Sequence, residues 1–108
     1  MNTLRNKVQL IGNLGKDPEI ITLEGGKKLV KFSLATNEYY KDKDGQKQTK
    51  TDWHNVVAWN KTAELIEQYV SKGKEIAIEG KLSTRSYEDK EGQKRYTTEV
   101  IVNELLLL

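Results

Sequence analysis

The chain has 108 residues, which is enough for one domain with a modest hydrophobic core and too few for two. It lacks cysteine, which excludes disulfides, thiolate metal sites and a cysteine nucleophile, and no apolar run has the length of a membrane span or a signal segment. The 18 Lys and Arg against 16 Asp and Glu leave a net charge of +2, too small to indicate a nucleic-acid ligand by itself.

Apolar and polar residues alternate in four stretches of the chain, and the apolar members stand at even-numbered positions. In chain order these members are Leu4, Val8 and Leu10; Val30, Phe32 and Leu34; Val56 and Ala58; and Ile76, Ile78 and Leu82. A fifth stretch at 96–103 is rich in β-branched residues, although Ile101 breaks its alternation. Because successive side chains of a strand point to opposite faces, we predict five strands whose even positions face one interior.

Turn residues separate these stretches, and one segment between them has a helical period. The turn signals are Gly12, Gly15 and Asp17-Pro18; Gly25-Gly26; Asp44-Gly45 within a lysine-rich loop; and a hairpin tip at 88–92. Between the third and fourth strands, Ala63, Ile66, Tyr69 and Val70 share one helical face. We predict a helix that Asn60 or Thr62 caps and that ends at Lys72 and Gly73.

The predicted order of elements is that of the oligonucleotide-binding (OB) barrel. We therefore expect an all-β, five-stranded OB-fold barrel with one α-helix between strands 3 and 4, in a single domain at 1–108 without an internal repeat. In this fold the second and third strands and their flanking loops form the usual ligand face. Because the fold serves many functions, only the side chains of the site can indicate the ligand.

Two indoles are predicted to lie on the outward face of the third strand. Trp53 and Trp59 have outward parity, as do Asn55 and Val57 between them. Tyr40 ends the second strand beside the basic loop, and Tyr87 follows Arg85 on the fourth. Exposed rings stack on any base and neighbouring cations meet phosphates, so this pattern favours sequence-tolerant binding to unpaired strands. An open alternative is that a helix, a loop or a second subunit covers these rings.

The remaining candidates predict neither catalysis nor a metal or cofactor. His54 is the only histidine, and its inward parity favours a hydrogen-bonding role. Phe32 and Tyr69 are assigned to the core, whereas Tyr96 is left undecided. The sequence GNLGK at 12–16 lacks the spacing of a phosphate-binding loop, and the carboxylate pairs lie in lysine-rich loops. We therefore expect a protein that is not an enzyme.

Six segments resemble the bacterial single-stranded DNA-binding protein (SSB) family in the family's order: NKVQLIGNLGKDPE (6–19), FSLATN (32–37), DWHNVV (52–57), YVSKG (69–73), IEGKL (78–82) and RYTTEV (95–100). The resemblance implies a homotetramer that wraps single-stranded DNA. It implies stacking by Tyr40, Trp53, Trp59 and Tyr87 and phosphate contacts by Lys7, Lys43, Lys61, Lys72 and Arg85, with Lys31 and Arg95 as further candidates. Residues 40 and 87 are tyrosine where members often have Trp, and Trp59 replaces a frequent Phe; stacking survives these changes.

The same resemblance implies a cytoplasmic, nucleoid-associated protein that protects single strands during replication, recombination and repair, without a membrane partner. Members often continue into an acidic tail that recruits replication and repair proteins, and the sequence ends instead in four leucines, which we expect to continue a strand. An alternative is an OB-fold assembly module, or a primosomal-type protein-interaction module, with weak DNA binding. The nearly neutral charge and the missing acidic tail motivate it.

Overall fold

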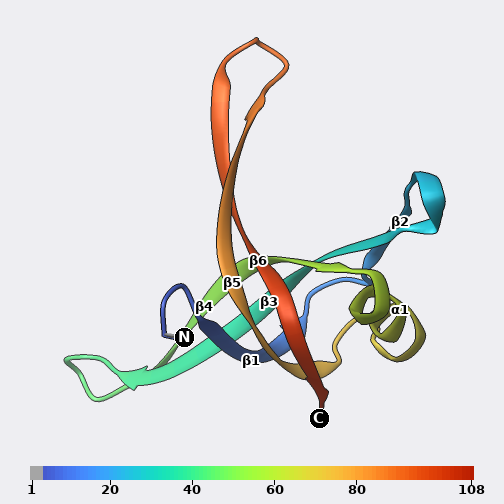
Figure 1. The fold of residues 1–108 in the computed structure, drawn as a ribbon. Coiled ribbons are helices and arrows are strands. Elements are labelled where there is room, and N and C mark those ends of the chain that lie inside the picture. The colour runs from blue at the N-terminus through green and yellow to red at the C-terminus, as the bar shows by residue number, and fades with distance from the viewer. Residues whose placement is uncertain (1–3) are drawn as a thin grey trace.

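In the computed structural model, which describes residues 4–108, five strands close into a barrel, and a short additional strand lies on its edge (Figure 1). The elements are β1 (Val8–Leu14), β2 (Glu19–Thr22), the 3-10 turn η1 (Glu24–Gly26), β3 (Lys28–Lys41), β4 (Lys47–Trp59), α1 (Asn60–Tyr69), β5 (Glu75–Glu88) and β6 (Lys94–Leu107). The predicted five-stranded OB-fold barrel, with one helix between its third and fourth strands, is confirmed. The prediction missed β2, whose 4 residues are too few to show an alternating pattern.

Barrel closure depends on two short strand pairings. The strand order is β1-β5-β6-β4-β3-β2, and β1 also pairs with β3. This β1–β3 pairing aligns Asn13 with Ala35 and Leu14 with Leu34, whereas the parallel β4–β6 pairing aligns Val56 with Val100 and Val57 with Ile101. A Cβ at Gly12 would collide with the carbonyl oxygen of Ala35. A residue without a side chain is therefore required where β1 crosses β3.

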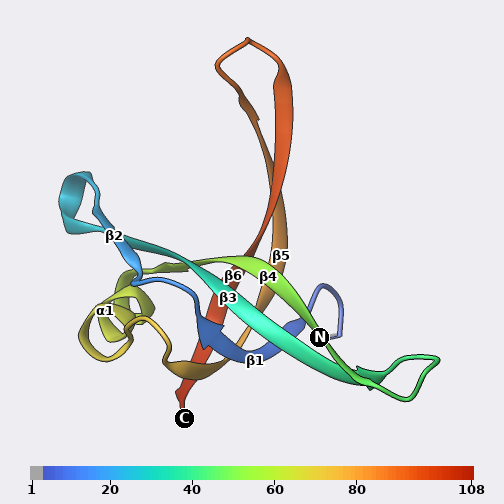
Figure 2. The ribbon, with the colours of Figure 1, turned by 180° about the vertical axis from the view of Figure 1, so that it is seen from behind.

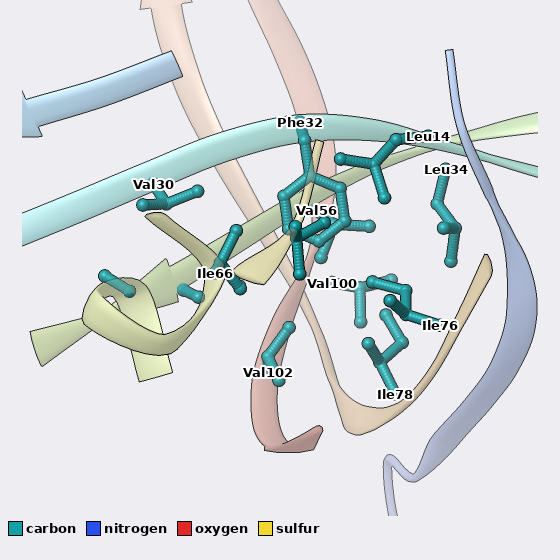
Figure 3. Close-up of a cluster of buried hydrophobic side chains, with 13 residues drawn as sticks. Leu14, Val30, Phe32, Leu34, Val56, Ile66, Ile76, Ile78, Val100 and Val102 are labelled. Carbon is teal, nitrogen blue, oxygen red and sulfur yellow. The ribbon is translucent and has the colours of Figure 1, made fainter. Parts of the chain in front are cut away.

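The core confirms the predicted inward parity for most of the barrel (Figure 3). Its strand residues all have even numbers, and Ala63, Ile66 and Val70 add the helical side. The full set is Leu14, Val30, Phe32, Leu34, Val56, Ala58, Ala63, Ile66, Val70, Ile76, Ile78, Val100 and Val102. Aliphatic and β-branched side chains interdigitate here, and the helix thereby covers one end of the barrel.

The parity prediction was wrong at Leu4 and Leu82, where the chain enters or leaves the barrel, and at two positions within it. Leu4 is 81% exposed because the chain turns before β1, where the Asn6 side chain donates to Leu82 O (2.9 Å) and accepts from Leu82 N–H (2.8 Å). Leu82 itself is 48% exposed, near the point where β5 leaves the barrel. Val57 and Ala35 are buried at odd positions. Val57 lies between Lys31 of β3 and Ile101 of β6, and Ala35 lies between β1 and Trp53.

The helix is shorter than predicted and lacks the predicted cap. It begins at Asn60 with Trp59 as the N-cap residue, and no side chain caps it. It ends at Tyr69, where the Val70 N–H donates to Ile66 O at 2.9 Å. The assignment of Tyr69 to the core was wrong, because the chain becomes extended at Val70, which takes the buried position and leaves Tyr69 exposed.

Two long hairpins project from the barrel in different directions (Figures 1 and 2). We call residues 36–52 of β3–β4 the first arm and residues 83–99 of β5–β6 the second arm. The β3–β4 register runs without interruption from Leu29↔Trp59 to Lys41↔Lys47. As expected, the terminal leucines continue a strand, since β6 extends to Leu107. Within residues 4–108, no helix has the length and hydropathy needed to cross a membrane.

Candidate functional site

Trp53 lies on the outward face of β4, with its ring over a glycine. Its side chain is 60% exposed. A Cβ placed on Gly15 would lie 2.5 Å from Cζ3 and 2.6 Å from Cη2 of the Trp53 ring, so the edge of the indole rests on the Gly15 backbone. The Gly15 N–H donates to Ser33 O at 3.3 Å, which fixes this segment to β3. The ring is therefore supported from below while most of its surface stays free for a ligand.

A groove of about 330 Å³ runs over the outward face of β3 and β4 to the base of the second arm. It is lined by Lys16, Asp17, Glu19, Lys31, Phe32, Ser33, Asn55, Val56, Arg85, Thr97 and Glu99. Three cations, three carboxylates and three neutral polar side chains therefore share this surface. Lys16, Ser33 and Thr97 were not predicted as site residues. Lys16 follows Gly15, and Ser33 has outward parity, so both signals were present in the sequence.

Arg85 is held against the groove by a carboxylate. Its Nε donates to Glu99 Oε1 at 3.0 Å, and the Glu99 side chain is largely covered whereas that of Arg85 is half exposed. A guanidinium has five N–H donors, so donors remain for a second anion. Glu99 therefore orients Arg85 and at the same time competes with any anionic ligand for it.

Trp59 extends the outward row of β4 toward the helix. It is 41% exposed and lies opposite Leu29. At about 3.3 Å per residue, the six-residue step along β4 separates Trp53 and Trp59 by about 20 Å. Val57 between them is buried, so the row presents two separated indoles and not a continuous aromatic strip.

The predicted tyrosines lie on the arms and not in the groove. Tyr87 pairs with Arg95 and, by alternation, shares the strand face of Arg85. Tyr40 pairs with Gln48 and lies on the face of the first arm opposite to Trp53, whereas Tyr39, which is more exposed, has the parity of Trp53. The structure therefore places Tyr87 on the strand face of Arg85, outside the groove lining, and separates Tyr40 from Trp53.

The predicted basic residues are dispersed. Arg85 and Lys31 line the groove. Lys7 lies beside β5, with Nζ 3.5 Å from Glu79 Oε1, and Lys43 lies near the end of the first arm. Lys61 lies in the first turn of α1, and the Lys72 N–H donates to Asp17 Oδ1 at 2.8 Å. All four of these lysines are outside the groove lining.

His54 and Tyr96 each have a contact with a polar or charged neighbour. His54 Nε2 is hydrogen-bonded to Thr36 Oγ1 at 2.9 Å, which confirms a hydrogen-bonding role. Tyr96 is exposed, and Lys94 Nζ lies 5.5 Å from the centroid of its ring. Among residues 4–108, His, Asp and Glu do not form a group of three that could hold a metal ion.

Nearly the whole chain is similar in sequence to known proteins. The sequence model of the "Single-strand binding protein family" matches residues 5–108. Single-stranded DNA-binding protein 1 of Chlorobaculum tepidum is 47% identical over 104 residues, and the protein of that name from Xylella fastidiosa is 48% identical. Each alignment covers 95% of this chain, but only 64% of the Chlorobaculum protein and 76% of the Xylella protein.

A solved structure agrees as well. The structure titled "Plasmodium falciparum SSB complex with ssDNA" superposes with a TM-score of 0.85 and 38% sequence identity. The superposition covers 100% of this chain and 99% of the chain in that complex. The likeness therefore includes the arms as well as the barrel.

Proposed function

The chain belongs to the single-strand binding protein family, and on that premise we propose that it binds single-stranded DNA without catalysing a reaction. The observation that carries this proposal is the exposed Trp53 ring, supported by Gly15 beside a groove that contains three cations. A flat ring open to solvent stacks on an unpaired base, whereas paired bases in a duplex keep their faces covered. The site therefore favours single strands over duplex DNA.

We propose a division of roles between rings and cations. Trp53, Trp59, Tyr87 and Tyr40 would stack on bases, each contributing about 1–3 kcal/mol. Lys31 and Arg85 of the groove, together with Lys16, would contact phosphates between these rings. Lys7, Lys43, Lys61 and Lys72 would extend the basic surface along the path of the strand. Neither stacking nor phosphate contact distinguishes one base from another, so strong sequence preference is not expected.

A fluorescence titration with oligo-dT tests this function. We expect the tryptophan emission to be quenched on binding, with an affinity that falls as salt rises, because each neutralised phosphate adds about 0.7 to the salt slope. Trp53→Ala should weaken binding by about 5- to 150-fold, which corresponds to the loss of one stacked base. Tyr69→Ala removes an equally exposed ring on α1 and serves as the control. Absence of binding at low salt, or equal effects of both variants, would contradict the proposal.

We further propose that the functional unit is a homotetramer. The outward face of β1, β5 and β6 supports it, since Ile11, Ala77 and Leu106 are aligned across three strands. Ile11 and Leu106 are 63% and 62% exposed, and a groove of about 760 Å³ lies over this face. Adjacent exposed apolar side chains of this kind favour a protein partner. Light scattering should give the mass of a tetramer, and Ile11→Glu should give smaller species; a monomeric wild type would refute the proposal.

This assembly would protect single strands during replication, recombination and repair in the cytoplasm. Recruitment of replication and repair proteins would need an acidic segment outside the 108 residues. The alternative of an assembly module with weak DNA binding makes a different prediction in the same titration. A tetramer that does not bind oligo-dT at low salt would favour that alternative.

A further inference from the structure

The two arms end in nearly the same sequence. Residues 40–47 read YKDKDGQK, and residues 87–94 read YEDKEGQK. The pattern in both is a tyrosine, a variable residue, Asp-Lys, an acidic residue, then Gly-Gln-Lys. We call residues 42–47 the first tip and residues 89–94 the second tip. The repeat is too short to indicate a duplicated domain, but it places six identical residues out of eight at the ends of both projecting hairpins (Figure 1).

An aspartate organises the first tip. Asp42 Oδ1 accepts hydrogen bonds from the backbone N–H groups of Asp44 and Gln46, both at 2.9 Å. Its backbone N–H donates to Gln46 O at 3.0 Å, and the Gly45 N–H donates to Asp42 O at 3.1 Å. Asp42 Oδ2 accepts from Gln48 Nε2 at 3.0 Å. One carboxylate thus satisfies two backbone donors within the loop and also ties the loop to β4.

The second tip repeats the bonds of the aspartate Oδ1 and of the loop backbone. Asp89 Oδ1 accepts from the N–H groups of Glu91 and Gln93, both at 2.9 Å. The Asp89 N–H donates to Gln93 O at 3.0 Å, and the Gly92 N–H donates to Asp89 O at 3.1 Å. The donor to Oδ2 differs: it is Arg95 Nε at 3.0 Å, and Arg95 Nη2 also donates to Gln93 Oε1 at 3.3 Å. Gly45 and Gly92 have nearly equal positive φ angles of 76° and 78°, so both loops have the same local conformation.

These bonds act on ionised carboxylates. The hydrogen bond from the backbone of Gln46 lowers the pKa of Asp42. The pKa of Asp89 is lowered by the hydrogen bond from Arg95 and by that from the backbone of Gln93. Charge-assisted hydrogen bonds are the stronger ones, so each tip is held by its aspartate at neutral pH.

Each tip presents two lysines, one in the loop and one at the start of the strand that follows it. They are Lys43 and Lys47 in the first tip and Lys90 and Lys94 in the second. Within residues 4–108 none of the four has a carboxylate within ion-pair distance. A loop that is ordered before binding loses less conformational entropy when a ligand arrives.

We propose that Asp42 and Asp89 are positioning residues that fix the two tips in one shared conformation and so present the tip lysines to the phosphates of a bound single strand. Lys90 then has in the second arm the role of Lys43 in the first. The inference rests on the proposed function. Coulomb repulsion alone predicts that the negative charges of Asp42 and Asp89 weaken the binding of DNA. The inference predicts the opposite, because both carboxylates hold the tips in the conformation that binds.

A pair of variants with equal charge tests this in the first tip. Asp42→Ala and Asp44→Ala each remove one negative charge, but only Asp42 accepts hydrogen bonds from the loop backbone. In oligo-dT titrations at low salt, Asp44→Ala should bind about twofold more tightly, because one repulsive charge is lost. Asp42→Ala should bind about three- to tenfold more weakly, because the loop loses its order. The affinity of Asp42→Asn, which keeps an oxygen acceptor, should lie between those of the two alanine variants. Equal affinities of the two alanine variants would overturn the inference.

Lysine variants test the equivalence of the two tips. Lys43→Ala and Lys90→Ala should lower the salt slope by similar amounts, about 0.7 each. A normal slope for Lys90→Ala beside a reduced one for Lys43→Ala would overturn the shared role.

Amide NMR spectra of the free protein separate this inference from the proposed function. Asp42→Ala should shift the Asp44 and Gln46 amide signals, and unchanged signals would refute the anchoring role whatever the DNA result. If the wild type does not bind oligo-dT, the proposed function fails and the phosphate role of the tips fails with it. If the wild type binds and the matched alanine variants are equal, only the inference fails.

Discussion

Substituting Gly15 should move the Trp53 ring without removing it. The Cβ of Gly15→Ala would lie 2.5 Å from Cζ3 and 2.6 Å from Cη2, although ordinary carbon contacts are near 3.5 Å or longer. The ring edge must therefore retreat by about 1 Å, which the exposed indole can do by rotation. We expect folding stability to change by less than about 1 kcal/mol, because the clash is with a mobile ring edge and not with backbone. Binding of oligo-dT should lose part of one stacking interaction, about 0.5–1.5 kcal/mol, or roughly 2- to 13-fold.

The assay is a fluorescence titration in a Trp59→Phe background, in which Trp53 is the only indole. Gly15→Ala should change the emission of the free protein and weaken oligo-dT binding less than Trp53→Ala does. Gly12→Ala is the contrasting variant, since its Cβ would meet the Ala35 backbone, and it should lower the unfolding midpoint. Unchanged emission and unchanged affinity in Gly15→Ala would refute the stacking of Trp53 on Gly15.

Three further outcomes follow from the geometry. Glu99→Gln removes the carboxylate that competes for Arg85, so oligo-dT should bind about two- to fivefold more tightly at low salt; weaker binding in the same titration would show that Glu99 mainly orients Arg85. Ile66→Ala should lower the free energy of unfolding in urea by about 2–5 kcal/mol, because Ile66 is fully buried between α1 and the barrel; a loss below about 1 kcal/mol would contradict this packing. Asp42 and Asp89 have folded-state pKa values below the ordinary 3.8, so the order they give the tips is present above that pH and is lost as pH falls through the lowered values. Tip amide shifts that stay constant until the barrel unfolds would contradict this.

The sequence predicted the barrel best where local pattern and burial agree. Val30, Phe32 and Leu34 alternate along one strand and enter one core, so their parity was sufficient. Beyond the barrel, the alternation of apolar and polar residues does not predict which side chains are buried, because neither face of an arm faces the core. Tyr40 could not be assigned to a face of the first arm for that reason.

The groove could not be predicted from the sequence because it forms only when the barrel closes. Lys16, Lys31 and Arg85 come from separate elements and meet only when β6 lies beside β4 and β1 crosses β3. The support of Trp53 by Gly15 is equally non-local. By contrast, Trp53 and Trp59 were correctly predicted to be exposed, since two outward positions on one strand are a local property.

The two short pairings that close the barrel, β1–β3 and β4–β6, which we call its seams, also affect how the chain folds. The hairpins β3–β4 and β5–β6 join neighbours in sequence, so their loop-closure entropy is small. The β1–β3 and β4–β6 seams are each held by few aligned residue pairs, and the β4–β6 seam cannot form before the last strand is made. We expect the hairpins to form early and the seams late, with folding on the millisecond-to-second scale of non-local β-proteins. We therefore expect formation of these two seams to limit the rate of folding.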